Sequence, residues 1–165
     1  MKAYLANGLF SRADFLFNEY LLEGIRWDIP ELKVYAPQEN EAINDKSEYA
    51  DSLAIAEADS KELMSSDLLI AVIDGVEIDS GVSAEIGMFA TTGKPIFALY
   101  TDSRQQGNGH IMKLLALQED ATENQFMYRN LFVIGLIKKS GGGVYADEMS
   151  LIKAVGDYVE ETEND

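Results

Sequence analysis

The sequence lacks cysteine altogether and contains a single histidine, His110. The absence of cysteine excludes disulfides, thiol nucleophiles and thiolate metal sites. One histidine is too few for a multi-histidine metal site within a single chain. Any covalent chemistry must therefore use aspartate, glutamate, serine, threonine, tyrosine or lysine side chains.

Positive charge is also scarce, because 13 lysine and arginine residues face 29 aspartate and glutamate residues, for a formal net charge of −16. Lysine and arginine contacts with phosphate supply most non-specific affinity for nucleic acid, and an acidic protein repels both nucleic acid and anionic membranes. We therefore expect a small neutral ligand as the partner, and neither a nucleic-acid polymer nor a membrane. Most of the acids, including the C-terminal stretch 160–165, are interpreted as solubilising surface charge.

The chain has no apolar run close to the roughly 18 residues that cross a bilayer. Its N-terminal apolar stretch is short and is interrupted by Asn7 and Gly8, which is unlike a signal-peptide core, so the sequence predicts a cytoplasmic protein. With 165 residues, 47% hydrophobic and 25% charged, the chain is predicted to form one globular domain over residues 1–165 with an acidic tail at 160–165.

The most informative segment is 67–90, which has the pattern of a strand, a loop and a helix. Residues 68–73 are continuously apolar, Gly75 and Gly81 interrupt the pattern, and apolar residues then recur at helical spacing. This order favours a parallel sheet, in which ligands bind beyond the carboxyl ends of the strands. Asp79, Ser80 and Glu85 would then face a crevice. The alternative is that Asp79 or Ser80 caps the helix and Glu85 is an ordinary acid of its first turn.

The rest of the chain alternates between strand and helix patterns. The predicted strands are residues 2–6, 32–36, 68–73 and 95–100, and the predicted helices are 11–24, 47–64, 82–90 and 149–159. Residues 131–137 are apolar on every face, so periodicity does not separate a strand from a buried helix there. Residues 140–143 are interpreted as a turn, and the polar loop 101–110 as a solvated connection, with a mobile lid as the alternative. The sequence therefore predicts an α/β fold: a single-domain, flavodoxin- or Rossmann-like parallel sheet of about five strands flanked by helices.

Several segments resemble the nucleoside 2-deoxyribosyltransferase family. Residues 4–10 are similar to the family's N-terminal aromatic-Gly strand turn, and residues 79–87 match its acid-Gly-x-x-x-Glu-x-Gly signature, which is the more specific of the two. Asp59 matches a helix-borne aspartate near the nucleobase. Asn130, at the start of the segment that runs to Gly135, resembles an asparagine that reaches a neighbouring subunit's site.

This resemblance implies that Glu85 is a nucleophile, which attacks C1′ of a 2′-deoxynucleoside and releases the base to leave a glycosyl-enzyme ester. The positive end of the helix dipole would favour its ionised form. Tyr4 would hydrogen-bond Glu85, and Asp59 would assist protonation of the departing base. The resemblance also implies a set of substrate-binding residues: Asp79 and Asn130 at the sugar 5′-hydroxyl, together with Gly81, Gly8, Phe10 and Glu41.

The implied reaction needs neither a metal nor a redox cofactor. Attack by a second nucleobase would give exchange with retention and ping-pong kinetics, whereas attack by water would make the same site a hydrolase. A homo-oligomer with shared active sites is expected from Asn130. The alternative is that Asn130 caps a helix within its own chain.

The sequence departs from the family pattern at Glu41, which stands where well-known members have a base-reading glutamine, and in continuing well beyond Gly135. Two other functions stay open. A 2′-deoxynucleoside 5′-monophosphate N-glycosidase would need phosphate donors, for which Ser11 and Arg12 are the candidates, and a non-catalytic nucleotide sensor would not need Asp59, Asp79 and Glu85 together. From the residues alone, Tyr4 could equally be a core aromatic and Asp59 an exposed helix acid.

Overall fold

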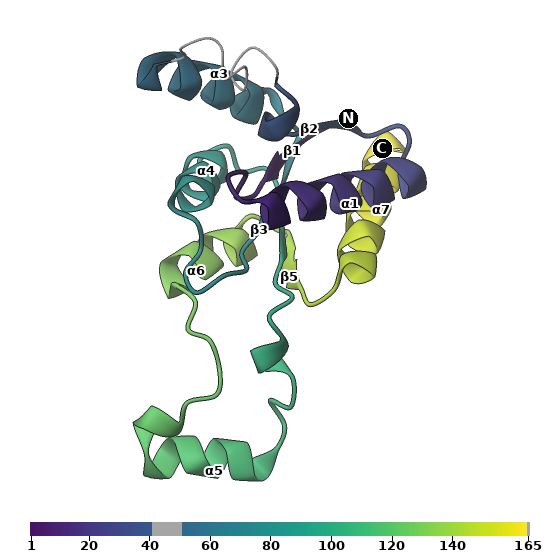
Figure 1. Ribbon diagram of the computed structural model, residues 1–165. Coiled ribbons are helices and arrows are strands. Elements are labelled where there is room, and N and C mark those ends of the chain that lie inside the picture. Colours follow the sequence, from purple (N-terminus) through teal and green to yellow (C-terminus); the bar gives the residue numbers. More distant parts are fainter. Residues whose placement is uncertain (41–50, 165) are drawn as a thin grey trace.

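A computed structural model describes residues 1–40 and 51–164 of the chain. It contains a five-stranded sheet, in which every pair of neighbouring strands is parallel and the strand order is β2-β1-β3-β4-β5. The strands are β1 (Lys2–Ala6), β2 (Lys33–Tyr35), β3 (Leu68–Val72), β4 (Ile96–Leu99) and β5 (Gly143–Tyr145). The predicted parallel α/β fold is confirmed (Figure 1).

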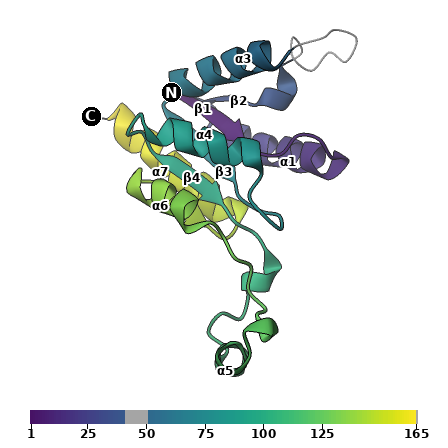
Figure 2. The ribbon, with the colours of Figure 1, turned by 90° about the vertical axis from the view of Figure 1, so that its left-hand side faces the viewer.

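Helices cover both faces of this sheet. Helices α1 (Arg12–Asp28) and α7 (Glu148–Glu163) pack on one face, and α3 (Ser52–Ser65), α4 (Ser80–Ala90) and α6 (Leu131–Lys139) pack on the other. Figure 2 shows α4 and α6 in front of the sheet with α7 behind it. Because both faces are covered, alternate residues of β3 enter opposite cores and all five are buried.

The fifth strand follows the run of glycines that the sequence suggested was only a turn. A Cβ atom on Gly142 would lie 2.0 Å from the carbonyl oxygen of Ile96, so only glycine allows the chain to approach β4 this closely. The three-residue strand β5 then pairs with β4 and forms one edge of the sheet. Such a short strand has too few residues for an alternating pattern to be recognised.

The helices differ from the prediction at several points. Helix α1 continues through Gly24, which lies against Ile152 of α7, because packing between the two helices outweighs the low helix propensity of glycine. The helix ends at Asp28, two residues before Pro30. Residues 131–137 belong to a helix, with Val133 and Ile137 buried beneath it. The last helix continues four residues beyond Val159, so most of the predicted acidic tail is helical. Residues 47–50 of the predicted helix 47–64 lie outside the described residues.

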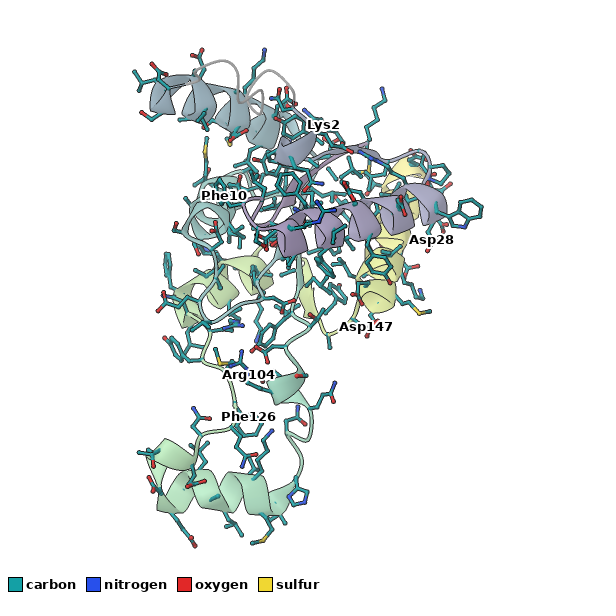
Figure 3. All side chains as sticks on the ribbon, viewed as in Figure 1. Lys2, Phe10, Asp28, Arg104, Phe126 and Asp147 are labelled. Carbon is teal, nitrogen blue, oxygen red and sulfur yellow. The ribbon has the colours of Figure 1, made fainter. Side chains whose placement is uncertain are left out.

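Residues 103–128, called the arm below, project away from the sheet (Figures 1 and 2). The arm contains helix α5 (Ile111–Glu119), which the sequence analysis did not identify, and none of its nine residues is buried. Figure 3 shows Arg104 and Phe126 at the neck of the arm, where Lys113 Nζ lies 4.3 Å from the centre of the Phe126 ring. No helix in the described part of the chain is long and apolar enough to cross a membrane.

Candidate active site

The first group of site residues is formed by a hydrogen bond between β1 and α4. Tyr4 is fully buried in β1, between β2 and β3, and its hydroxyl donates a 2.6 Å hydrogen bond to Oε1 of Glu85. Burial and the adjacent Glu85 carboxylate raise the pKa of the Tyr4 hydroxyl, so Tyr4 remains a hydrogen-bond donor. This contact holds one oxygen of Glu85 in place, and Tyr4 is thus both a core aromatic and a partner of the candidate nucleophile.

Glu85 lies in the second turn of α4 and is itself largely buried. Its pKa rises from the usual 4.5 to about 7, chiefly because burial disfavours the charged form. The hydrogen bond from Tyr4 lowers the pKa, while the carboxylates of Asp59 and Asp79 raise it. Burial thus opposes the ionisation of Glu85 that the helix dipole was expected to favour.

Asp59 reaches this group from α3, on the same side of the sheet. Burial raises the pKa of Asp59, and its Oδ1 atom is buried without a hydrogen-bond partner among the described residues. Buried polar atoms rarely stay unpaired, and an acid with a raised pKa can keep its proton. Asp59 is thus not an exposed helix acid, and its position suits a group that exchanges a proton with a ligand.

Asp79 caps the helix that carries Glu85. Its Oδ1 atom accepts hydrogen bonds from the backbone N–H groups of Gly81 and Val82, at 2.8 and 3.1 Å. A Cβ atom on Gly81 would lie 3.0 Å from that oxygen, which gives a physical reason for glycine at this point of the signature. The sequence analysis left two roles open for Asp79, a helix cap or a group that faces the ligand. The exposed Asp79 side chain is compatible with both.

A cavity of about 440 Å³ opens beside Asp79, at the carboxyl ends of β1, β3 and β4. Gly8 and Phe10, two members of the predicted substrate-binding set, line it, and Phe10 is 85% exposed. Four carboxylates also line the cavity: Asp14, Asp74, Glu77 and Asp79. Of these the sequence analysis had singled out only Asp79 as a site residue.

A buried asparagine holds the loop that forms the wall of this cavity. The Asn18 side chain is 3% exposed and donates to the Gly8 carbonyl at 3.0 Å and to Gln38 Oε1 at 2.8 Å. Its oxygen accepts a 2.7 Å hydrogen bond from Asn7. The sequence analysis missed Asn18, although a polar residue on the apolar face formed by Leu21, Leu22 and Ile25 was a usable signal.

One predicted residue, Asn130, does not join this group. Asn130 is exposed and caps α6, where its side-chain oxygen accepts from the N–H groups of Phe132 and Val133. Glu41 lies outside the described residues. No cluster of three or more histidine, cysteine, aspartate or glutamate side chains suited to a metal ion occurs within residues 1–40 and 51–164.

Comparison with known proteins identifies the family of this chain. Residues 3–149 match the model of a family described as nucleoside 2-deoxyribosyltransferase. The chain belongs to that family. Family membership indicates an enzyme that acts on nucleosides and nucleobases.

Solved structures with the same fold include relatives at very different distances. A conserved protein from Enterococcus faecalis V583 is 51% identical, with a TM-score of 0.89 over 95% of this chain and 98% of that one. A 2-deoxyribosyltransferase from Bacillus psychrosaccharolyticus is 17% identical, with a TM-score of 0.63 over 92% and 90%. A CMP N-glycosidase from Clostridium botulinum is 16% identical, with a TM-score of 0.50 over 96% and 99%. No curated protein matches the chain.

Proposed function

We propose that the protein transfers the 2-deoxyribosyl group of a nucleoside from one nucleobase to another through a covalent bond to Glu85. The observation that carries this proposal is the partly buried Glu85 carboxyl group, held at one oxygen by Tyr4 and influenced electrostatically by Asp59 and Asp79. Retaining chemistry at a sugar carbon needs a fixed carboxylate nucleophile and a second acid nearby. The cavity beside Asp79 is the nearest described hollow that includes a residue of this group, and Glu85, Tyr4 and Asp59 are not among its lining residues.

The proposed reaction has two steps. In the first, the free oxygen of ionised Glu85 attacks C1′, the bond from C1′ to the base nitrogen breaks, and the base leaves with the proton of Asp59. In the second, a nitrogen of the incoming base attacks C1′, the ester bond to Glu85 breaks, and Asp59 regains a proton from that nitrogen. The raised pKa of Asp59 supports this assignment, because burial makes its carboxyl group hold a proton more tightly than an exposed aspartate does.

The cavity favours a nucleoside over a 5′-nucleotide. Both helix N-termini beside it already carry a carboxylate, since Asp14 is hydrogen-bonded to the backbone N–H of Ser11 and Asp79 caps α4. The hydrogen bonds with Ser11 lower the pKa of Asp14, so this group is anionic. Arg12, the other candidate for holding phosphate, is exposed and lines a separate hollow. A phosphate dianion would meet several negative charges, and no lysine or arginine is among the described residues that line the cavity.

The neutral 5′-hydroxyl group fits this environment better. The hydrogen bonds to Gly81 and Val82 both use Oδ1 of Asp79, so Oδ2 can accept a hydrogen bond from the sugar. Asn130 would supply its amide N–H group, which has no partner among the described residues, and this group would come from a second copy of the chain. We therefore assign Asp79 and Asn130 to the 5′-hydroxyl, with Asp79 acting within its own subunit.

The exposed apolar surface around Asn130 supports a homo-oligomer. Tyr128, Leu131 and Phe132 are 71–74% exposed, and on α5 the side chains of Ile111 and Met112 are also more than half exposed. A nine-residue helix without a buried residue is marginal in isolation and gains stability by packing against another surface. A second copy of the chain can cover this surface and complete the site.

Product analysis tests the proposed reaction. The protein is incubated with 2′-deoxyinosine alone and then with added adenine or cytosine, with Glu85→Ala as the matched inactive control. We expect a new deoxynucleoside only when the acceptor base is present. Free hypoxanthine without any new nucleoside would identify a hydrolase, and a ligand that binds without any base release would favour the sensor.

A further inference from the structure

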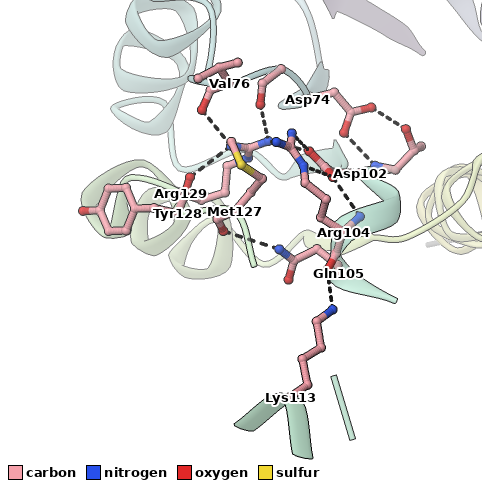
Figure 4. Close-up of polar contacts among 11 residues, drawn as sticks. Asp74, Val76, Asp102, Arg104, Gln105, Lys113, Met127, Tyr128 and Arg129 are labelled. Carbon is pink, nitrogen blue, oxygen red and sulfur yellow. Dashed lines mark hydrogen bonds and ion pairs between the residues drawn. The ribbon is translucent and has the colours of Figure 1, made fainter. Parts of the chain in front are cut away.

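Arg129 is the only charged residue that is buried in the described part of the chain, with 8% of its surface exposed. Its guanidinium group donates to the backbone carbonyl of Gly75 at 2.6 Å and to that of Val76 at 3.3 Å. It also donates to the carbonyl of Tyr128 at 3.0 Å (Figure 4). A single side chain at the start of α6 thus holds two consecutive carbonyls of the loop that follows β3.

The surroundings of Arg129 join three segments that are distant in the sequence. The guanidinium carbon lies 4.4 Å from the centre of the Tyr100 ring, and a guanidinium nitrogen lies 3.8 Å from Asp102 Oδ2. Its Nε atom is buried without a partner among the described residues. Burying a charged side chain is costly unless its hydrogen bonds compensate. The pair of hydrogen bonds from the Arg129 guanidinium group to Gly75 and Val76, called the fork below, therefore indicates that Arg129 holds this loop in place.

The start of the same loop is held by the segment that follows β4. Asp74 accepts hydrogen bonds from the backbone N–H of Thr101 at 2.7 Å and from its hydroxyl at 2.5 Å. Figure 4 shows the Asp74 and Arg129 contacts on either side of the loop. Residues 77–79 follow directly, and Glu77 and Asp79 line the cavity. The hydrogen bonds of Arg129 and of Thr101 therefore fix the position of the backbone that leads into the residues lining the cavity.

We propose that Arg129 is a positioning residue that fixes the Gly75–Val76 backbone and thereby places Asp79 against the 5′-hydroxyl group of the substrate. The inference rests on the proposed function, because it concerns the sugar end of that same site. Arg129 itself makes no contact with substrate and acts through the loop. Asn130 follows Arg129 in the chain but is assigned to the site of the second copy, so the proposal for Arg129 concerns Asp79 alone.

A comparison of two substrates tests the proposal. Arg129→Gln removes the fork, whereas Arg104→Gln removes the same charge from a half-exposed side chain that pairs with Asp102 but does not touch the loop. The substrates are 2′-deoxyinosine and 2′,5′-dideoxyinosine, which lacks the 5′-hydroxyl. We expect Arg129→Gln to lower kcat/KM for 2′-deoxyinosine by roughly tenfold or more, because the hydrogen bond between Asp79 and the 5′-hydroxyl group is weakened in the transition state. The same substitution should change kcat/KM little for 2′,5′-dideoxyinosine.

Arg104→Gln should leave both values near those of the wild type. Equal losses on both substrates with Arg129→Gln would show a general structural role and would overturn the proposal. If Arg129→Gln does not fold, Arg129→Lys makes the same comparison, because lysine keeps the charge but cannot present the planar fork.

Amide hydrogen exchange provides a readout that is independent of catalysis. Arg129→Gln should speed amide hydrogen exchange in residues 75–82, including the backbone N–H groups of Gly81 and Val82 that donate hydrogen bonds to Asp79, while the amides of β1 and β3 stay protected. Unchanged exchange in 75–82 would overturn the inference whatever the activity. If the wild-type protein cleaves no nucleoside, the proposed function fails, and faster exchange would still establish that Arg129 fixes this loop.

Discussion

Burial of Glu85 has a consequence for stability that can be measured without any substrate. When folding raises the pKa of a carboxyl group, the folded state binds more protons than the unfolded state at any pH between the unfolded-state pKa and the folded-state pKa. For Glu85 that window runs from the usual 4.5 to about 7. The wild-type protein therefore loses stability as the pH rises through this window, and the loss is complete above about pH 7.

The substitution Glu85→Gln removes this penalty while keeping the shape of the side chain. The amide oxygen of glutamine can still accept the hydrogen bond from Tyr4. The two pKa values differ by about 2.5, and at about 1.36 kcal/mol for each pH unit the full penalty is about 3 kcal/mol. Roughly 2 kcal/mol of it develops between about pH 5.5 and pH 8.5, since part is already present at the lower pH.

The assay is urea unfolding followed by circular dichroism, at the two pH values and for both proteins. The difference in free energy of unfolding between Glu85→Gln and wild type should increase by roughly 2 kcal/mol towards the higher pH. Glu57→Gln, at an exposed position of α3, is the control for the loss of one negative charge. A difference that stays the same at both pH values, or one that Glu57→Gln reproduces, would refute the argument that Glu85 is desolvated.

Four further outcomes concern catalysis. Glu85→Ala should fold and lose at least about a thousandfold in rate, measured by base release; more than a tenth of wild-type activity would exclude Glu85 as the nucleophile. Asp59→Asn should lower kcat for purine release with little change in KM, and a raised KM alone would assign Asp59 to binding. Tyr4→Phe removes a hydrogen bond that lowers the Glu85 pKa, so the acidic limb of the pH–rate profile should move to higher pH, and an unmoved limb would contradict the role of Tyr4. Asn130→Asp keeps a helix-capping oxygen but loses the amide donor, so it should be inactive on its own. If active sites are shared between subunits, mixing Asn130→Asp with Glu85→Ala under conditions of subunit exchange should restore activity. A wild-type protein that is fully active as a monomer by light scattering would contradict the homo-oligomer.

The sequence by itself determined the parallel α/β fold and the elements nearest the site. The continuous apolar run of β3 and the spacing of Val82, Ile86 and Phe89 are local patterns, and each records which faces of a strand or helix are buried. The capping box of Ser11 and Asp14 is similarly local and is present at the start of α1. The segments that resemble the family identified Tyr4, Asp59, Asp79 and Glu85 before their contacts were known.

Tertiary structure alone decided what surrounds those residues. The pKa of Glu85 depends on burial and on carboxylates from other elements, so no local pattern indicates that it lies near 7. The contacts of Arg129 with Gly75 and Val76 join residues more than fifty positions apart, and the arm departs from the sheet between β4 and α6. Periodicity reports the burial of a residue against its own element's neighbours, whereas desolvation, charge proximity and long-range hydrogen bonds arise only when distant segments are packed together.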